Sequence, residues 1–415
     1  MPFDIATVDR AQCGEERVVK PNLYISAIYI SPPGTMGGNT KILIEAINHL
    51  SHEYELVVFT TEPQTLATGI DSDVACRIEE IPYPFQKMSF GSHLLELRYL
   101  RRWYSEYFRN RPLAKSDLFY SASDFAPDVV PIFGLRRKYD FQWFPSLFLF
   151  IPNPWENVRN GYKFPFVKYS IYFVYQRFLF SLMQARATGI IVTNKSDYSN
   201  FKKRHSPSQF AIYGGVNLEE IDEAKQKLGD AKVEHEYDVL FCGRLHEQKG
   251  IDGFLDIWRL VVDELPLVRL GVIGNGAPKY ENYLRAKASE IGLDKNVDWL
   301  GYVNGPEKYA LYLQSKLFVH PTIYDNNGMV AAEALCSSLP VIMYDLQNLE
   351  DLYDSGCIKV PRFDKEQFAR SIVSVLTNDR VRLSLELGPD RMQALRLEWS
   401  WESRMQQLAS FLGAR

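Results

Sequence analysis

Short apolar runs alternate with helix-like segments along the first half of the chain. The short runs are rich in Val, Ile, Phe and Tyr, whereas the apolar residues of the helix-like segments recur every three to four positions. These patterns predict strands at residues 23–30, 56–59, 118–121, 147–151 and 189–194, and helices at 40–50 and 127–135. Strand, loop, helix and strand in this order predict an α/β domain.

The second half repeats this alternation more regularly. Strand patterns occupy residues 239–242, 268–273, 297–300, 317–320 and 341–344. Helical patterns separate most of these strands, as in a parallel sheet with helices on both faces. The tail, residues 380–415, has a helical pattern with a break at Trp399-Ser-Trp401.

Length and composition indicate two globular domains. The chain has 415 residues, of which 46% are hydrophobic and 24% charged, and a single core rarely grows beyond about 250–300 residues. The start, Met1-Pro-Phe-Asp4, lacks the regions of a secretory signal, and no apolar run reaches the ~18 residues of a membrane-spanning helix. The cysteines are scattered without a C-x-x-C pair, which favours a reducing compartment without a zinc site. We therefore expect a cytoplasmic protein.

Two segments of the first half combine basic and aromatic residues. Residues 87–111 interleave arginines with aromatic side chains, and residues 159–180 add lysine, arginine and further aromatics. Such segments lie on anionic lipid surfaces, or they form solvated helices that pack their aromatics inward. No nucleic-acid-binding motif accompanies the basic residues, so we expect no nucleic acid partner.

A glycine-containing loop follows the first predicted strand. It reads Ser31-Pro-Pro-Gly-Thr-Met-Gly37-Gly38, which is neither a dinucleotide-binding G-x-G-x-x-G sequence nor a Walker A sequence. A Gly-Gly pair at the carboxyl end of a strand lets the backbone approach a ligand closely. The same pair also suits a plain tight turn, and both interpretations stay open.

Charged residues and glycines follow consecutive strands of the second half. Arg244 and Lys249 come after the first of these strands, and Gly274 and Tyr302 follow the next two. Because the carboxyl ends of parallel strands meet at one edge of a sheet, the two cations are predicted to clamp a diphosphate there. The glycines at these ends leave the backbone free to contact a flat ring.

Two carboxylates, Asp325 and Glu333, flank the start of a predicted helix. The first belongs to a polar loop, and the second lies in the helix, which Pro340 ends. Amide groups at a helix start bind phosphate or sugar oxygens, although a capping Asp and an exposed Glu are ordinary in such places. Because four loops share this edge, the sequence favours a nucleotide with a diphosphate, whose ribose hydroxyls donate to Glu333.

Several motifs occur in one order between residues 239 and 345. They are G-R-L-x-x-x-K-G, G-N-G, L-G-Y-V and, after an acidic residue, G-M-V-A-A-E-A-L-x-x-x-x-P-V-I. Together they resemble the retaining GT-B glycosyltransferases of the glycosyl transferases group 1 family, which use nucleotide sugars. The resemblance implies an α/β fold of two Rossmann-like domains that face each other across a cleft. Residues 1–211 would form the acceptor side and 212–385 the donor side, with a helix in 386–415 returning to the first domain.

The resemblance also implies roles for individual residues. Arg244 and Lys249 would hold the donor diphosphate, Glu333 the ribose, and Asp325 stands where the family has a Glu that contacts the donor sugar. Backbone groups would complete the site, namely those of Gly37, Gly38, Gly274, Tyr302, Gly328, Met329 and Val330. Such enzymes generally need no metal or other cofactor and retain anomeric configuration, and the leaving phosphate takes the acceptor proton.

Two features depart from the family pattern. Asp325 is one methylene shorter than Glu, and no histidine occurs between residues 93 and 205, where the family often has one at a strand end. Asn153 is the nearest polar candidate for that position, although an alignment also allows Phe148 or Leu149.

Partners and alternative functions follow from these observations. We expect a glycan or polyprenyl-linked acceptor, and a peripheral place on a membrane through residues 87–111 and 159–180. The departures also suit a nucleotide-sugar-binding or regulatory protein without turnover. Another enzyme of the same fold is a further alternative. The Asp-x7-Glu spacing with Arg and Lys argues against an epimerase, and no pyridoxal-binding lysine of a phosphorylase is identifiable.

Overall fold

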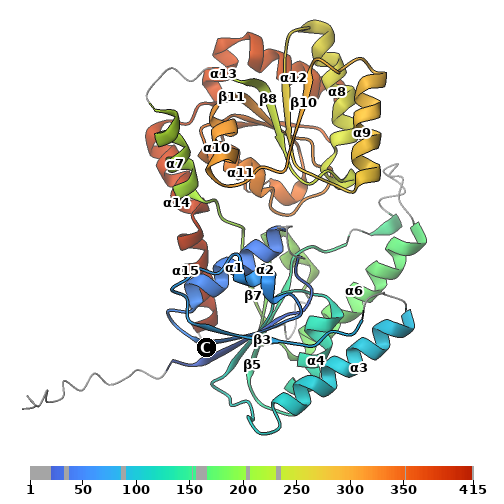
Figure 1. The fold of residues 1–415 in the computed structure, drawn as a ribbon, viewed down its shortest axis with the longest axis vertical. Coiled ribbons are helices and arrows are strands. Elements are labelled where there is room, and N and C mark those ends of the chain that lie inside the picture. Colours follow the sequence, from blue (N-terminus) through green and yellow to red (C-terminus); the bar gives the residue numbers. More distant parts are fainter. Residues whose placement is uncertain are drawn as a thin grey trace, which may run out of the picture.

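The computed structural model describes residues 20–31, 37–85, 90–151, 153–155, 166–201, 206–229, 235–350 and 352–413. These residues form two α/β domains, each built around one parallel sheet, and Figure 1 shows one domain above the other. The expected α/β fold with two Rossmann-like domains is thus confirmed. Of the predicted basic segments, residues 87–89 and 159–165 lie outside the described residues.

The first sheet has seven strands in the order β3-β2-β1-β4-β5-β6-β7. They are β1 (Asn22–Ala27), β2 (Glu55–Thr60), β3 (Cys76–Glu80), β4 (Leu118–Ser121), β5 (Gln142–Leu147), β6 (Gly189–Val192) and β7 (Ser208–Ala211). The central strands are buried, as strands between two layers of helices must be. The strand order reverses between β1 and β4, and α/β sheets bind ligands at the carboxyl ends of such a switch point.

Helices cover both faces of the first sheet. They are α1 (Gly38–Leu50), α2 (Pro63–Ala67), α3 (Phe90–Tyr107), α4 (Ala126–Arg136) and α6 (Phe166–Arg186), with the short 3-10 helix η1 (Lys195–Asn200) after β6. Residues of α3, α4 and α6 share one hydrophobic core, whereas α1 packs into another on the opposite face.

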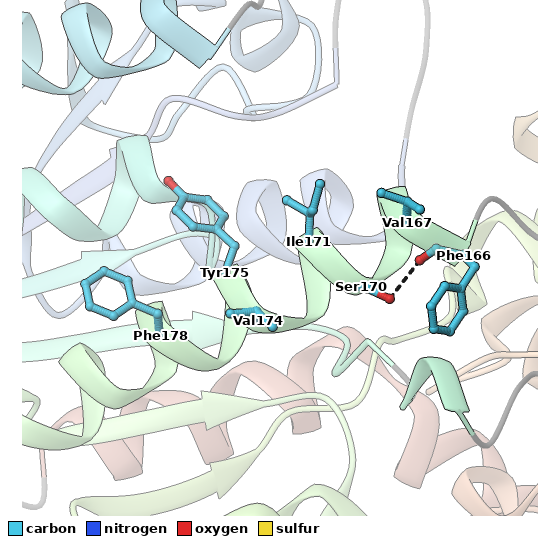
Figure 2. A pocket seen from close by; sticks show the side chains of 7 residues that line it. All are labelled: Phe166, Val167, Ser170, Ile171, Val174, Tyr175 and Phe178. Atoms are coloured by element: carbon cyan, nitrogen blue, oxygen red, sulfur yellow. Dashed lines mark hydrogen bonds between the residues drawn. The ribbon is translucent and has the colours of Figure 1, made fainter.

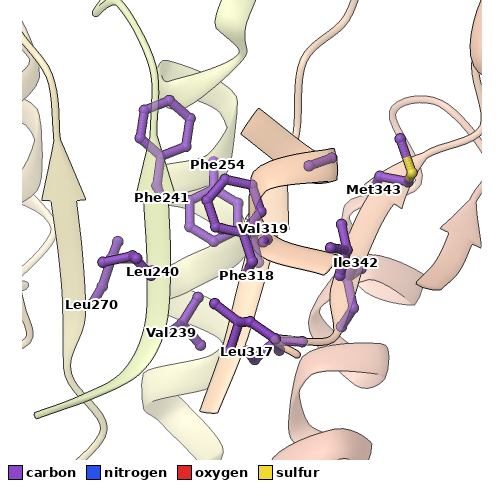
Figure 3. Close-up of a cluster of buried hydrophobic side chains, with 14 of the residues drawn as sticks. Val239, Leu240, Phe241, Phe254, Leu270, Leu317, Phe318, Val319, Ile342 and Met343 are labelled. Atoms are coloured by element: carbon purple, nitrogen blue, oxygen red, sulfur yellow. The ribbon is translucent and has the colours of Figure 1, made fainter. Parts of the chain in front are cut away.

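The second sheet has six parallel strands in the order β10-β9-β8-β11-β12-β13. They are β8 (Tyr237–Cys242), β9 (Leu270–Ile273), β10 (Val297–Gly301), β11 (Ser315–His320), β12 (Val341–Tyr344) and β13 (Cys357–Val360). Figure 3 shows their apolar side chains packed together, with Phe254 of helix α8 (Ile251–Glu264) against them. The switch point of this sheet lies between β8 and β11.

The remaining helices surround the second sheet and return to the first. They are α7 (Leu218–Leu228), α9 (Pro278–Glu290), α10 (Gly305–Leu313), α11 (Met329–Cys336), α12 (Lys365–Thr377), α13 (Asp379–Leu385), α14 (Pro389–Trp399) and α15 (Trp401–Gly413), with the short 3-10 helices η2 (Glu247–Lys249) and η3 (Gln347–Leu349). Figure 1 shows α14 and α15 running from the second domain down along the first.

The C-terminal helix α15 is part of the first domain's core. Trp401, Met405 and Leu408 are buried there together with residues of α1. A Cβ atom at Gly215 would lie 2.4 Å from the Trp401 ring, so glycine is needed where the chain passes from the first domain to the second. The returning helix implied by the family resemblance is confirmed.

The sequence predictions fail at the position of one strand and at strands that lie on the edges of the sheets. The strand predicted at 147–151 is wrong, because β5 ends at Leu147 and the apolar residues Phe148 and Phe150 are buried in the following loop. Strands β3, β7 and β13 were not predicted. All three lie at sheet edges, where polar residues interrupt the apolar run that marks a central strand.

The basic helix α3 packs its aromatic side chains inward. Tyr104 and Phe108 are fully buried, and the Trp103 and Tyr107 rings pack against Phe59 of β2 with their centroids 5.6 and 5.0 Å away. Of the two interpretations of residues 87–111, the described part therefore supports the solvated helix. No helix in the described ranges has both the length and the apolar character needed to cross a bilayer.

Candidate functional site

An ion pair bridges the switch point of the second sheet. Lys249 ends η2 after β8, and Asp325 lies in the loop after β11. The Lys249 Nζ atom lies 2.6 Å from Asp325 Oδ2, and the two side chains are 23% and 15% exposed. Lys249, which was predicted to bind the diphosphate, is therefore in direct contact with Asp325, which was predicted to contact the donor sugar.

The Asp325 carboxylate is also bound by its own loop. Its Oδ1 atom accepts hydrogen bonds from the backbone N–H groups of residues 326–328, at 2.9, 3.3 and 3.3 Å. The buried His320 ring lies 3.6 Å from Oδ2. Burial opposes the charged form, but Lys249 and His320 outweigh it and hold the pKa of Asp325 well below its usual range. Since both oxygens are engaged, the geometry suits positioning of Lys249 and of the loop.

Glu333 lies on α11 beside a lysine that the sequence analysis did not single out. Its Oε1 atom accepts a hydrogen bond from Lys308 Nζ at 2.9 Å, and Oε2 accepts one from the Tyr312 hydroxyl at 3.4 Å. The Lys308 and Glu333 side chains are only 13% and 6% exposed. Burial disfavours the Lys308 cation, but the Glu333 carboxylate outweighs this effect and raises the pKa of Lys308. Glu333, which was predicted to bind the ribose, is thus one member of a mostly buried ion pair.

The other predicted residues of the second domain lie at neighbouring strand ends. Arg244 follows β8 and Tyr302 follows β10, and both side chains are exposed. Gly274 follows β9 with a φ of 134°, and a Cβ atom there would lie 2.0 Å from the Gly243 carbonyl oxygen. Only glycine fits this contact, which holds the ends of β8 and β9 together.

The start of α11 also lies at the switch point. Gly328 caps the helix in a left-handed conformation, with a φ of 61°, and its carbonyl accepts a hydrogen bond from the Tyr353 hydroxyl at 2.8 Å. Met329 and Val330 follow in the first turn, where backbone N–H groups have no partner within the helix. An anion at this edge would therefore meet backbone donors as well as the cations.

The glycine loop of the first domain packs against this helix start. A Cβ atom at Gly38 would lie 3.5 Å from the Met329 sulfur, and one at Gly214 would lie 2.3 Å from it. Gly37 precedes α1 and donates its N–H to Ser31 Oγ at 2.9 Å. The predicted glycine pair is therefore brought to the same place as the second-domain residues.

Asparagine side chains join the two domains beside the Asp325 loop. The Asn326 Nδ2 atom donates to the Phe148 carbonyl and to Asp197 Oδ2, both at 3.0 Å. The Asn194 Nδ2 atom donates back to the Asn326 carbonyl at 2.9 Å. These bonds hold the loop after β11 against the ends of β5 and β6.

Asn153 makes a local contact. Its Oδ1 atom accepts the backbone N–H of Trp155 at 3.1 Å, so the side chain closes its own turn. Two residues that follow β5 reach the loop of Asp325 through their carbonyls, since Phe148 accepts from Asn326 and Phe150 accepts from Tyr324. The assignment of Asn153, Phe148 or Leu149 to the first-domain position stays a prediction.

Sequence reasoning missed Lys308, Asn326 and Asn194. A lysine in a first helical turn, or an asparagine in a loop, is ordinary, and no local signal marks these residues. Their partners are distant in sequence, 25 residues from Lys308 and 132 from Asn194. Among the described residues, no group of three or more His, Cys, Asp or Glu side chains is arranged to hold a metal ion.

Solved structures share the whole architecture. Sucrose-phosphate synthase from Thermosynechococcus elongatus superposes with a TM-score of 0.72 at 17% identity, over 95% of this chain and 99% of that one. The Anabaena protein HepE, solved in complex with UDP and glucose, superposes with a TM-score of 0.66 at 16% identity, over 95% and 100%. At these identities the likeness shows the fold alone, which is that of the GT-B glycosyltransferases.

Sequence comparison finds a family match within the second half of the chain. Residues 201–387 match the family described as "Glycosyl transferases group 1". Mannosylfructose-phosphate synthase from Agrobacterium fabrum is 27% identical over 187 residues, which cover 43% of this chain and 40% of that protein. The chain thus spans about two fifths of the length of this protein and of a second curated relative that it matches. The family resemblance expected from the motifs is confirmed.

Proposed function

We propose that this protein is a retaining hexosyltransferase that uses a nucleoside-diphosphate sugar. The observation that carries the proposal is the placement of Lys249, Asp325 and Glu333 around the switch point of the second sheet. Parallel sheets bind nucleotides at such a point, and the family consists of glycosyltransferases. The complex of HepE with UDP and glucose supports a donor of this chemical class.

In the proposed reaction the bond between the anomeric carbon and the diphosphate oxygen breaks. A bond from the same carbon to the acceptor oxygen forms on the same face, and the acceptor proton passes to the departing phosphate. Arg244 and Lys249 would neutralise the charge that develops on the diphosphate, together with the N–H groups at the start of α11. Asp325 would act as a positioning residue for Lys249, and Glu333 would accept hydrogen bonds from the ribose.

We further propose that these cations make a metal ion unnecessary. A protein that works in this way should transfer sugar at an unchanged rate in the presence of EDTA. A loss of activity that added Mg²⁺ restores would overturn this part of the proposal.

The first test is a thermal-shift panel of UDP, GDP, ADP and CMP on the wild type and on Glu333→Ala. A ligand at 100 times its dissociation constant should stabilise the fold by ~2.7 kcal/mol. We expect one nucleoside diphosphate to shift the wild type and to shift the variant much less. If no nucleotide shifts the wild type, the donor site is wrongly assigned.

The second test separates an enzyme from a binding protein without turnover. Release of the nucleoside diphosphate from the selected donor above the rate of Lys249→Met would exclude a purely regulatory role. The anomeric configuration of the product, read by NMR coupling constants, decides between retention and inversion.

We also propose that helix α6 rests on an anionic lipid surface, where a glycan or lipid-linked acceptor is reached. Val167, Ile171, Val174 and Phe178 recur along α6, and each is more than half exposed. Figure 2 shows these side chains along the helix. Helix α6 has no acidic residue and carries the exposed Lys168. Such a surface matches the interface of an anionic bilayer.

The proposed membrane contact is restricted to α6, because α3 packs its aromatics inward. In flotation with vesicles of phosphatidylcholine and phosphatidylglycerol we expect the wild type to bind, and Ile171→Gln/Val174→Gln to bind much less. The matched control is Leu94→Gln/Leu95→Gln, at two exposed leucines of α3. Absence of wild-type binding, or equal loss in both double variants, would contradict the proposal. The cytoplasmic location stays a prediction.

A further inference from the structure

The pair Lys308–Glu333 has features that a plain stabilising ion pair does not need. Its members come from α10 and α11, and both elements start at the carboxyl edge of the second sheet. A mostly buried ion pair contributes little net stability, because the cost of removing both charges from water offsets their attraction. The pair is not fully sealed either, since 13% and 6% of the two side chains remain exposed.

The hydrogen bonds leave acceptor and donor capacity within the pair. Lys308 Nζ donates a hydrogen bond to Glu333 Oε1 at 2.9 Å, whereas Oε2 has only a long contact of 3.4 Å with the Tyr312 hydroxyl. An O–H group normally donates at about 2.7–2.8 Å, so Oε2 is weakly engaged. An ammonium group carries three N–H donors, and in the described part of the chain Glu333 is the one hydrogen-bond acceptor recorded for Lys308.

This arrangement suits a pair of neighbouring hydroxyls. A hydroxyl both donates and accepts, so one can donate to a carboxylate while it accepts from an ammonium group. Hydrogen bonds to charged groups are also about twice as strong as neutral ones. The Lys308 ring contact fixes the cation further, because Nζ lies 4.4 Å from the centroid of Tyr309.

We propose that Lys308 is a positioning residue for the donor ribose. It holds the Glu333 carboxylate by Oε1, so that Oε2 points to the ribose hydroxyls, and the pair acts as a clamp that requires a ribonucleotide. This inference rests on the proposed function, because it needs a nucleotide at the switch point. It adds a second residue to the ribose contact and predicts discrimination against deoxynucleotides.

The test combines the loss of a ribose hydroxyl from the ligand with the loss of the Lys308 ammonium group from the protein. Affinities of the nucleoside diphosphate selected by the thermal-shift panel and of its 2′-deoxy and 3′-deoxy forms are measured by calorimetry. On wild-type protein we expect at least one deoxy form to bind about tenfold more weakly or worse, as for a lost hydrogen bond to a charged group. In Lys308→Met this ratio should fall to roughly threefold or less, because the two changes remove the same interaction.

Two further variants keep the test decisive. Glu333→Gln keeps the shape of the carboxylate and should lose the discrimination as Lys308→Met does. Lys365→Met removes a lysine paired with Asp256 at 2.6 Å, where both side chains are about 40% exposed, and should keep the wild-type ratio. The wild-type ratio can be measured even if Lys308→Met does not fold.

The outcomes separate this inference from the proposed function. If a nucleoside diphosphate binds but neither deoxy form is discriminated, the clamp is wrong and the donor site stands. The clamp is equally wrong if Lys308→Met weakens the ribo and deoxy forms by the same factor, since that result marks a purely structural pair. If no nucleoside diphosphate binds, the proposed function and the clamp fall together.

Discussion

The two sheets of this protein have switch points with the same topology and opposite electrostatics. Between β8 and β11 the carboxylate of Asp325 is paired with Lys249, and its pKa is well below the usual range. Between β1 and β4 the carboxyl of Asp128 bonds only neutral donors, among them Ser26 Oγ at 2.8 Å and the backbone N–H of Ile28 at 2.9 Å. Burial raises the pKa of Asp128 to about 6.

The difference distinguishes the two switch points by their local charge. Asp128 is 0% exposed and fully occupied in joining β1 to α4, so the first switch point is closed by its own side chains. Lys249 and Asp325 keep some access to solvent, and the exposed Arg244 follows the same strand, β8, as Lys249. A shared topology therefore marks two places, and only the local charges distinguish the structural one from the candidate donor site.

The largest expected effect is that of Lys249→Met on sugar transfer. Removing a cation that stabilises a leaving diphosphate should lower kcat by about 10²–10³-fold, as for loss of one group that stabilises transition-state charge. Steady-state rates with the selected donor measure this effect. Lys365→Met is the control for loss of a lysine elsewhere in the second domain, and its rate should equal that of the wild type. A Lys249→Met rate within threefold of wild type would contradict the assignment.

Gly274→Ala should strongly destabilise the second domain. The new Cβ atom would meet the Gly243 carbonyl at 2.0 Å, and the φ of 134° is strained for any side chain. Together these effects should cost about 3 kcal/mol or more in the free energy of unfolding. Denaturant titration measures the loss.

Gly253→Ala is the matched control for this change. Gly253 lies inside α8, and a Cβ atom there would have nothing within 4 Å, so alanine should stabilise the domain by about 0.5–1 kcal/mol. Equal effects of the two substitutions would show that close packing of the strand ends is unimportant.

Asp128→Asn should change how stability depends on pH. With a pKa of about 6, the folded protein keeps a proton on Asp128 between pH ~4 and ~6 that the unfolded chain releases. Stability therefore falls as pH rises through this window, by at most about 1.4 kcal/mol per pH unit for one proton. Denaturant titrations at several pH values should show a shallower fall in the variant.

Asp325→Asn should change the pH dependence of unfolding free energy with the opposite sign to Asp128→Asn, and in a lower pH range. Because the folded-state pKa of Asp325 is depressed, the stability it contributes is present above pH ~4 and is lost as pH falls further. The variant should therefore lack part of the loss in acid, while its slope between pH ~4 and ~6 stays that of the wild type. Identical pH profiles for the two variants would refute the electrostatic difference between the switch points.

The smallest effects are expected for two hydroxyls, one at each switch point. Ser123 Oγ donates to Asp128 Oδ2 at 2.5 Å, whereas Thr322 Oγ1 lies 3.4 Å from the His320 ring nitrogen. We expect Ser123→Ala to cost about 1–2 kcal/mol in unfolding free energy and Thr322→Val less than about 1 kcal/mol. A larger loss in Thr322→Val would reverse the order that the distances predict.

The sequence by itself determined the architecture and the part of the candidate site that the second domain contributes. Apolar runs mark the central strands because these are buried on both faces, and residues after them must meet at one sheet edge. Arg244, Lys249, Gly274 and Asp325 could therefore be placed together from their positions after strands. Edge strands such as β3 and β13 were not predicted, since half-exposed strands tolerate polar residues.

Only the tertiary structure decided which side chains touch. The contacts of Lys308 with Glu333 and of Asn194 with Asn326 join segments that no local pattern relates. The tertiary structure also showed that α3 buries its aromatic rings whereas α6 exposes apolar side chains, although both segments combine basic and aromatic residues. The physical reason is that composition and spacing define the faces of an element, whereas what covers each face depends on partners distant in the chain.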